Sequence, residues 1–194
     1  LGVRRQRQMC IRDRSTVDKL YTSYLLNKNK INCPETYIFR GQKAASGFIS
    51  NYNFKSKLIY KPLFGSQGDN IRLIERPSDL EKLENQTNIY YFQEYLDNSP
   101  NYDYRVLVIN NNDDIKYFYM TRYGETFINN FSKGAKCIKE KLNEDVIELA
   151  IKSSRLLNID FCGVDIIEYK RQYYVIEVNS IPAWKGLQRV ESSN

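Results

Sequence analysis

The stretch GVDIIEYKRQYYVIEVN, residues 163–179, decides how the rest of the chain is interpreted. Apolar and polar residues alternate along it with the period of two that a half-buried strand requires, except around Lys170 and Arg171. We therefore predict two antiparallel strands joined by a tight turn at these two residues. The core face of the second strand is expected to carry Tyr174, Ile176 and Val178.

Two carboxylates of this hairpin are expected to share the face opposite the core. Val164 and Ile166 take the core face, which leaves Asp165 on the other one, and Glu177 and Asn179 point the same way. If the loop holds an odd number of residues, Asp165 lies across from Glu177, with Cβ atoms about 5 Å apart. Because Mg²⁺ prefers oxygen ligands, we predict a site for Mg²⁺ or Mn²⁺ at these three polar residues. A solvated acidic face is the alternative.

The composition is that of a globular protein with one or two compact units. The chain has 194 residues, of which 42% are hydrophobic and 27% charged. No apolar run approaches 18 residues, so we expect no membrane span or signal peptide and a cytoplasmic location. Four cysteines without C-x-x-C spacing indicate reduced thiols. The absence of histidine excludes His-based triads, so any chemistry depends on carboxylates, Lys, Arg and the backbone.

The first 14 residues, LGVRRQRQMCIRDR, differ from the rest. They show no periodicity and hold five Arg against one Asp. We interpret them as a non-native or disordered basic leader and exclude them from the fold. Their net charge is +4, so only +2 of the formal +6 belongs to residues 15–194. A basic tail that binds nucleic acid or a membrane is the alternative.

From residue 15 onward helices alternate with strands, which predicts an α+β protein. A first amphipathic helix, capped by Ser15 or Thr16, is expected to use the apolar residues Val17, Leu20, Tyr21, Tyr24 and Leu25. Further helices are predicted after a short strand, at a capping box opened by Ser78, and after the cap Asn143. Strands are expected at both ends of residues 57–74 and within residues 88–96, 102–109 and 114–122.

A glycine loop, GSQG at residues 65–68, separates the two strands of residues 57–74. Glycine permits backbone N–H groups to approach phosphate oxygens, and Lys61 adds a positive charge at the base of the loop. A P-loop is excluded because no G-K-[ST] follows. An ordinary hairpin turn is the alternative. Arg105 and Arg122 lie in predicted strands and are either surface charges or forks for anionic oxygen.

In order and spacing these motifs resemble the ATP-grasp superfamily and, within it, the RimK-type α-L-glutamate ligases. The resemblance covers nearly everything from residue 15 onward and rests on Asp18 to Leu20, KPLFGSQG (61–68), QEYL (93–96), Asp103 to Arg105, Arg122, residues 130–135, GVDII (163–167) and EVNSIPAWKGL (177–187). It implies antiparallel sheets in two α+β lobes, residues 15–92 and 93–194, that enclose a nucleotide. The family's N-terminal domain is missing, so we expect a fragment truncated at its end.

The resemblance also assigns functions to individual residues. It implies nucleotide contacts for Lys19, Lys61, Gly65, Ser66, Gln67, Gly68, Glu94, Tyr95, Leu96 and Asp103. It implies catalytic functions for Arg105, Arg122 and Asn130. It implies metal ligation by Asp165, Glu177 and Asn179, in agreement with the hairpin.

The reaction implied is ATP-dependent amide formation. A carboxylate, of a cofactor or of a protein C-terminus, attacks the γ-phosphate, and an amine such as that of glutamate displaces phosphate from the acyl phosphate. Phosphoryl transfer needs positioning and charge neutralisation, which suits a site without histidine. The chain departs from the family at Asn70 (usually Gly), Ile128 (usually Arg) and Ala183 (usually Gly). These departures concern the choice of acceptor more than the nucleotide.

Two alternatives remain. EVNSIPAWKGL also resembles ATP-grasp ligases that act on a pterin or deazaflavin cofactor or on an amino-group carrier protein. A tyrosine-rich RNA-binding module is more distant, because the 16 Tyr residues mostly follow strand or helix periodicity and the net charge without the leader is small. Stabilisation by RNA alone, and not by Mg-ATP, would identify such a module.

Overall fold

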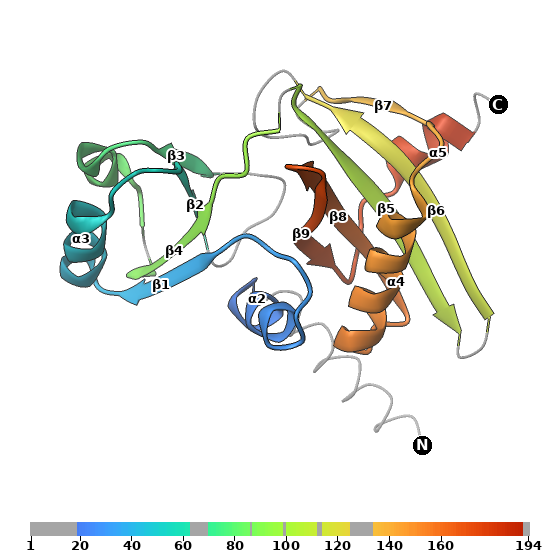
Figure 1. Ribbon diagram of the computed structural model, residues 1–194, viewed down its shortest axis with the longest axis horizontal. Coiled ribbons are helices and arrows are strands. Elements are labelled where there is room, and N and C mark those ends of the chain that lie inside the picture. The colour runs from blue at the N-terminus through green and yellow to red at the C-terminus, as the bar shows by residue number, and fades with distance from the viewer. Residues whose placement is uncertain are drawn as a thin grey trace. The chain divides into compact units, whose positions relative to one another are not determined.

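The computed structural model describes residues 19–62, 70–85, 87–98, 100–111, 114–124 and 134–191 (Figure 1). Their elements, in chain order, are α2 (Lys19–Lys28), β1 (Thr36–Arg40), α3 (Gln42–Asn51), β2 (Leu58–Lys61), β3 (Arg72–Ile74), the 3₁₀ helix η1 (Pro77–Lys82), β4 (Ile89–Glu94), β5 (Tyr102–Asn111), β6 (Asp114–Tyr123), β7 (Lys136–Ile138), α4 (Glu144–Leu157), β8 (Phe161–Tyr169), β9 (Gln172–Asn179) and α5 (Lys185–Glu191). Within these ranges, no helix has the length and apolar character needed to cross a membrane.

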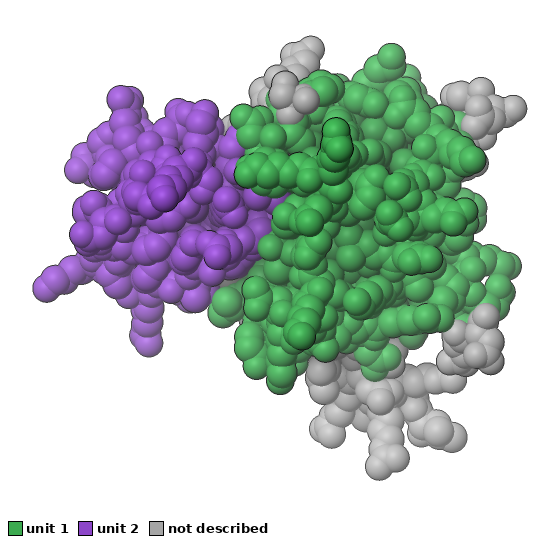
Figure 2. All heavy atoms as spheres, in the orientation of Figure 1, with its two compact units in different colours: residues 1–33, 97–194 green, residues 34–96 purple. Residues whose placement is uncertain are grey.

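The chain divides into two compact units (Figure 2). Unit 1 comprises residues 1–33 and 97–194, and unit 2 comprises Pro34–Leu96. The expected boundary between residues 92 and 93 therefore differs from the observed one. The larger difference is α2, which belongs to unit 1 because Leu26 packs into the same apolar core as α4.

Unit 2 is an antiparallel sheet in the order β1-β4-β2-β3. Helix α3 and η1 contribute to its core, which consists of Ala45, Ile49, Leu58, Tyr60, Ile74, Leu80, Tyr90 and Phe92. The predicted strands on either side of the glycine loop are confirmed, since Leu58 pairs with Ile74. The expected capping box is wrong: η1 starts after Arg76 with Pro77 in its first turn, and no side chain caps it.

Unit 1 is an antiparallel sheet in the order β7-β6-β5-β8-β9. Figure 1 shows α4 lying along one face of this sheet, where its apolar side chains share a core with α2 and the strands. The cap of α4 is confirmed, because Asn143 Oδ1 accepts a hydrogen bond of 3.0 Å from the Asp145 amide. Helix α5 packs on the opposite face, where Leu187 meets Leu107 and Met120.

The burial of α2 differs from the predicted one. Its buried residues are Thr22 and Leu26. Tyr21 and Tyr24, which were expected in the apolar stripe, are 46% and 53% exposed. A tyrosine presents an apolar ring and a polar tip, so it tolerates a surface position that the hydrophobic period alone does not anticipate.

The predicted hairpin of β8 and β9 is confirmed, but its strand register is set in a different way from the expected one. Lys170 and Arg171 form the turn with φ of 50° and 63°, the left-handed pair of a type I′ turn. This loop has an even number of residues, but a β-bulge follows: Ile166 pairs with Val175, and Asp165 pairs with Glu177. The bulge, not the loop, supplies the odd residue that places the two carboxylates opposite each other.

The same bulge changes which residues of β9 reach the core. Val175 and Val178 are both 1% exposed. Tyr174 and Ile176, assigned to the core face with Val178, are only half-buried. The strict alternation expected for this strand is therefore wrong, because an extra residue at a bulge reverses the faces beyond it.

Candidate active site

A row of charged side chains crosses the sheet of unit 1 on the face that α5 covers. The register places Asp103 of β5 opposite Arg122 of β6, and Arg105 of β5 opposite Asp165 of β8. Because positions two apart on a strand share a face, both pairs point the same way. The strands thus bring together four residues that lie far apart in the sequence, and all four are buried.

Arg105 and Asp165 form a bidentate ion pair. Arg105 Nε donates to Asp165 Oδ1 and Nη2 donates to Oδ2, both at 2.7 Å. Arg105 Nη1 donates to the carbonyl oxygen of Ala183 at 3.4 Å. One guanidinium therefore links β5, β8 and the segment that follows β9.

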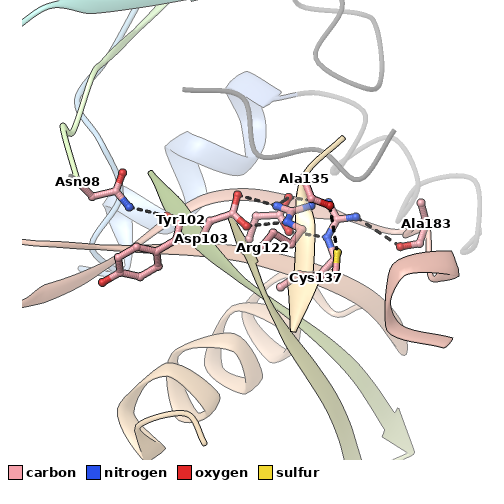
Figure 3. Close-up of polar contacts among 9 residues, drawn as sticks. Asn98, Tyr102, Asp103, Arg122, Ala135, Cys137 and Ala183 are labelled. Atoms are coloured by element: carbon pink, nitrogen blue, oxygen red, sulfur yellow. Dashed lines mark hydrogen bonds and ion pairs between the residues drawn. The ribbon is translucent and has the colours of Figure 1, made fainter. Parts of the chain in front are cut away.

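Arg122 is bound by two carboxylates. Its Nε and Nη2 donate to Oδ1 and Oδ2 of Asp103 at 2.6 and 2.8 Å, and Nη2 also lies 3.1 Å from Asp165 Oδ2. Figure 3 shows the side chains of Asp103 and Arg122 pointing toward each other. Arg122 is 2% exposed, and its Nη1 has no hydrogen-bond partner within the described residues.

The two aspartates differ in acidity because they have different numbers of cationic partners. Burial favours the neutral form of Asp165, but Arg105 and Arg122 outweigh burial and lower its pKa to about 2. Burial raises the pKa of Asp103 to about 6, and its single partner Arg122 offsets this only in part. Burial also disfavours the Arg122 cation, yet Asp165 and Asp103 together raise the pKa of that guanidinium. At neutral pH the four side chains form a charge-balanced network.

The predicted metal ligands lie beside this network. Asp165 pairs with Glu177, and Gly163 pairs with Asn179, so the three polar side chains share one face of β8 and β9. Glu177 and Asn179 are half-buried. No group of three or more His, Cys, Asp or Glu in the described ranges could hold a metal ion. The predicted set differs from such a group because its third member is an amide.

The oxygen atoms of this set fit a divalent cation. A carboxylate has about four lone-pair sites. Asp165 uses three of them, one on Oδ1 and two on Oδ2. Glu177 and Asn179 make no side-chain hydrogen bond within the described part of the chain, so their oxygens are the more available ligands. Oxygen atoms of this kind are those that Mg²⁺ prefers.

The segment after β9 is seated on the sheet at Gly163. A Cβ atom added to Gly163 would lie 2.7 Å from Pro182 Cβ, closer than two carbon atoms approach. Glycine at this position therefore allows Pro182 to contact the sheet beside the Arg105 to Ala183 bond. This contact was not predicted from the sequence, although the small residue before Val164 is a signal for close approach.

The residues assigned to the nucleotide in unit 2 lie on β2 and at the end of β4. Lys61 Nζ donates to Gln93 Oε1 at 2.6 Å. Glu94 and Tyr95 donate their backbone N–H groups to Glu35 and Lys57, and Leu96 is 4% exposed. Gln93 was not predicted as a site residue, although the alternation of β4 places it on the same side as Tyr91.

The two lysines assigned to the nucleotide belong to different units. Lys19 is the first residue of α2 in unit 1, whereas Lys61 belongs to unit 2. Asn70 has a φ of 56°, so it adopts the left-handed conformation that favours glycine. The remaining predicted residues lie outside the described residues, namely Gly65, Ser66, Gln67, Gly68 and Asn130.

Comparison with known proteins supports the interpretation of these motifs. The family model of the RimK-like ATP-grasp domain matches residues 16–194. The alpha-aminoadipate–LysW ligase LysX of Saccharolobus solfataricus is 30% identical over 186 residues, covering 91% of this chain and 66% of LysX. The tetrahydromethanopterin:alpha-L-glutamate ligase of Methanocaldococcus jannaschii is 29% identical over 187 residues, covering 91% of this chain and 62% of that enzyme. The chain thus spans less than two thirds of the length of these relatives.

Solved structures share the fold. The ATP-grasp ligase PsnB, solved in complex with a minimal precursor, Mg and ADP, matches with a TM-score of 0.65 at 19% identity. The match covers 92% of this chain and 55% of PsnB. The α+β fold of the ATP-grasp type, expected from the resemblance, is confirmed.

Proposed function

Since this chain belongs to the RimK-like ATP-grasp domain family, we propose that the protein is an ATP-dependent carboxylate–amine ligase that adds L-glutamate through an acyl phosphate. The observation that carries the proposal is the charged row on the sheet of unit 1. Two arginines and two carboxylate-bearing strands meet there beside Glu177 and Asn179. Family membership supports the reaction type, and the geometry supports the place where it occurs.

The proposed reaction mainly requires that negative charge on the phosphate groups be stabilised. A substrate carboxylate attacks the γ-phosphorus of ATP, ADP leaves, and the amine of glutamate then displaces phosphate from the acyl phosphate. Arg105 and Arg122 stabilise the negative charge on the transferred phosphoryl group as fixed cations in a buried site. Their bonds to Asp165 and Asp103 hold both guanidinium groups in place before substrate arrives.

Mg²⁺ or Mn²⁺ is the proposed metal, and Asp165, Glu177 and Asn179 would hold it. When bound, the ion neutralises phosphate charge and orients the phosphate groups. Glu177 and Asn179 offer the available oxygens, while Asp165 contributes from its remaining lone pair. The presence of Mg and ADP in the PsnB structure supports this choice.

The remaining assignments concern the nucleotide. We propose that Lys19 and Lys61 contact ATP, that the loop Gly65 to Gly68 closes over the phosphates, and that Glu94 to Leu96 run along the adenine and ribose. Asn130 is proposed to act with Arg105 and Arg122.

The class of acceptor is proposed from the substrates that appear in the names of the relatives. LysX is named for LysW, and the Methanocaldococcus enzyme for tetrahydromethanopterin. We propose that the acceptor is a carboxylate on a cofactor or at a protein C-terminus. Two apolar side chains that follow the metal motif, Ile181 and Trp184, are 84% and 62% exposed. They flank Ala183, whose carbonyl oxygen accepts the hydrogen bond from Arg105. They are the proposed apolar surface for the acceptor.

A melting experiment tests the proposal. Mg-ATP should raise the melting temperature of the chain, and ATP with EDTA should raise it less, because the phosphates then lack their counter-ion. Poly-U serves as the competing ligand. No stabilisation by Mg-ATP, or stabilisation by poly-U alone, would reject the ligase.

A further inference from the structure

Both oxygens of the Asp103 side chain are bonded to Arg122. Both carboxylate oxygens accept hydrogen bonds from the guanidinium, at 2.6 and 2.8 Å, and Asp103 is 3% exposed. The two residues are direct cross-strand neighbours on β5 and β6, so the strand register fixes this geometry. In this arrangement the carboxylate holds Arg122, a function that the family resemblance did not imply.

Arg122 keeps one donor group unused. Its Nε and Nη2 are taken by Asp103 and Asp165, but Nη1 has no hydrogen-bond partner in the described ranges. Within the described residues, Thr121 Oγ1 is the only other buried side-chain oxygen or nitrogen atom without a hydrogen-bond partner. A buried donor without a partner is destabilising, so such a donor in a native structure calls for a reason.

The two arginines share Asp165 but have different main partners. Each guanidinium has its own bidentate carboxylate, Arg105 with Asp165 and Arg122 with Asp103. Without the charge of Asp103, Asp165 would be the one carboxylate left in an ion pair with these guanidinium groups among the described residues. Arg122 would then compete with Arg105 for it and turn its fork toward β8.

We infer that Asp103 is a positioning residue, which holds the Arg122 fork so that Nη1 remains free for an anionic oxygen of the substrate. This inference rests on the proposed function, because the anion is the γ-phosphate of ATP. Asp103 itself touches no substrate. Its effect passes through Arg122 alone.

A double-mutant cycle tests this dependence. The variants are Asp103→Asn, Arg122→Gln and the pair, and the measurement is the affinity for Mg-ATP and for Mg-ADP by calorimetry. The ratio of the two affinities reports contacts to the γ-phosphate, which a merely structural role would not change. Asp103→Asn should lower the preference for ATP by about tenfold, as expected for loss of one charge-assisted hydrogen bond. The double variant should be no worse than Arg122→Gln alone.

Three results would overturn the inference. One is an Asp103→Asn variant whose preference for ATP is unchanged, and another is equal weakening of ATP and ADP, which indicates a direct or structural role. The third is addition of the two single effects in the double variant. If wild type itself fails to bind Mg-ATP, the proposed function fails and the inference with it.

Two further variants keep the experiment interpretable. Asp114→Asn removes an exposed carboxylate from the start of β6 and should leave both affinities unchanged, since Asp114 forms an ion pair with the surface residue Lys116. Should Asp103→Asn fail to fold, Asp103→Glu keeps the charge but moves the carboxylate. A folded Asp103→Glu with the wild-type preference for ATP would count against positioning.

Discussion

Arg105 and Asp165 face each other across β5 and β8 and share two hydrogen bonds of 2.7 Å. This pairing gives Asp165 two functions, because the residue proposed as a metal ligand also fixes the arginine proposed to meet the phosphoryl group. Glu177 lies opposite Asp165 on the next strand and makes no such pair. The metal should therefore depend most on Glu177, and the arginines most on Asp165.

Arg105→Lys should reduce turnover of the whole enzyme more than it reduces ATP affinity. Lysine replaces a planar fork by a single point charge, so it cannot hold both oxygens of Asp165 and the Ala183 carbonyl together. Steady-state kinetics with ATP and glutamate, compared with calorimetry for Mg-ATP, separate the two effects. Wild-type turnover in the Lys variant would show that Arg105 has no part in the reaction.

Gly163→Ala should destabilise the chain by about 1–3 kcal/mol, the usual cost of overpacking. The new Cβ would meet Pro182 Cβ at 2.7 Å, so either the strand or the segment after β9 must move. Chemical denaturation measures the loss.

Gly47→Ala is the matched control for this change. Gly47 lies within α3 with nothing within 4 Å of an added Cβ, so alanine there should stabilise the helix by about 0.5–1 kcal/mol. Equal effects of the two substitutions would mean that the contact with Pro182 is not tight.

The two aspartates should change folding stability with pH in opposite directions. Asp103 has a folded-state pKa of about 6, above its ordinary 3.8, so its contribution to stability is present at low pH and is lost as pH rises through 6. Asp165 has a folded-state pKa of about 2, so its contribution is present above 3.8 and is lost as pH falls toward 2. Denaturation of wild type and Asp103→Asn between pH 4 and 7 isolates the contribution of Asp103 to stability. Wild type should gain stability relative to the variant as pH falls, and a constant difference would contradict the assignment.

Much of the fold could be predicted from periodicity and turn chemistry. The hairpin at residues 163–179, the strands around the glycine loop and the Asn143 cap all depend on local signals. The exposed tyrosines of α2 and the 3₁₀ conformation of η1 could not be predicted, because tertiary packing decided them. The bulge at Ile176 was also missed, since nothing in the alternation marks where an extra residue is inserted.

The sequence predicted which residues belong to the candidate site better than it predicted the contacts between them. Asp165 and Glu177 were expected opposite each other, and they are. The ion pairs of Arg105 and Arg122 were not expected, because pairing across β5, β6 and β8 depends on strand order, which a single sequence does not reveal. Asp103 received its nucleotide function by resemblance, and only the register shows that Arg122 occupies both of its oxygens.

Glu177→Gln tests the central claim, that the hairpin holds a metal which binds ATP. The substitution keeps the shape of the side chain and removes one negative charge, which leaves a weaker ligand. Two guanidinium groups already neutralise Asp165, so the melting temperature without Mg-ATP should stay close to that of wild type. In the whole enzyme the rate should fall by roughly 10³-fold or more.

The most direct measurement is the melting temperature of wild type, Glu177→Gln and the control Glu148→Gln, each with and without Mg-ATP. Glu148 is exposed on α4, which covers the opposite face of the sheet. We expect full stabilisation by Mg-ATP in wild type and in Glu148→Gln, and a clearly smaller one in Glu177→Gln. Stabilisation of Glu177→Gln equal to that of wild type would contradict the metal site and the account built on it.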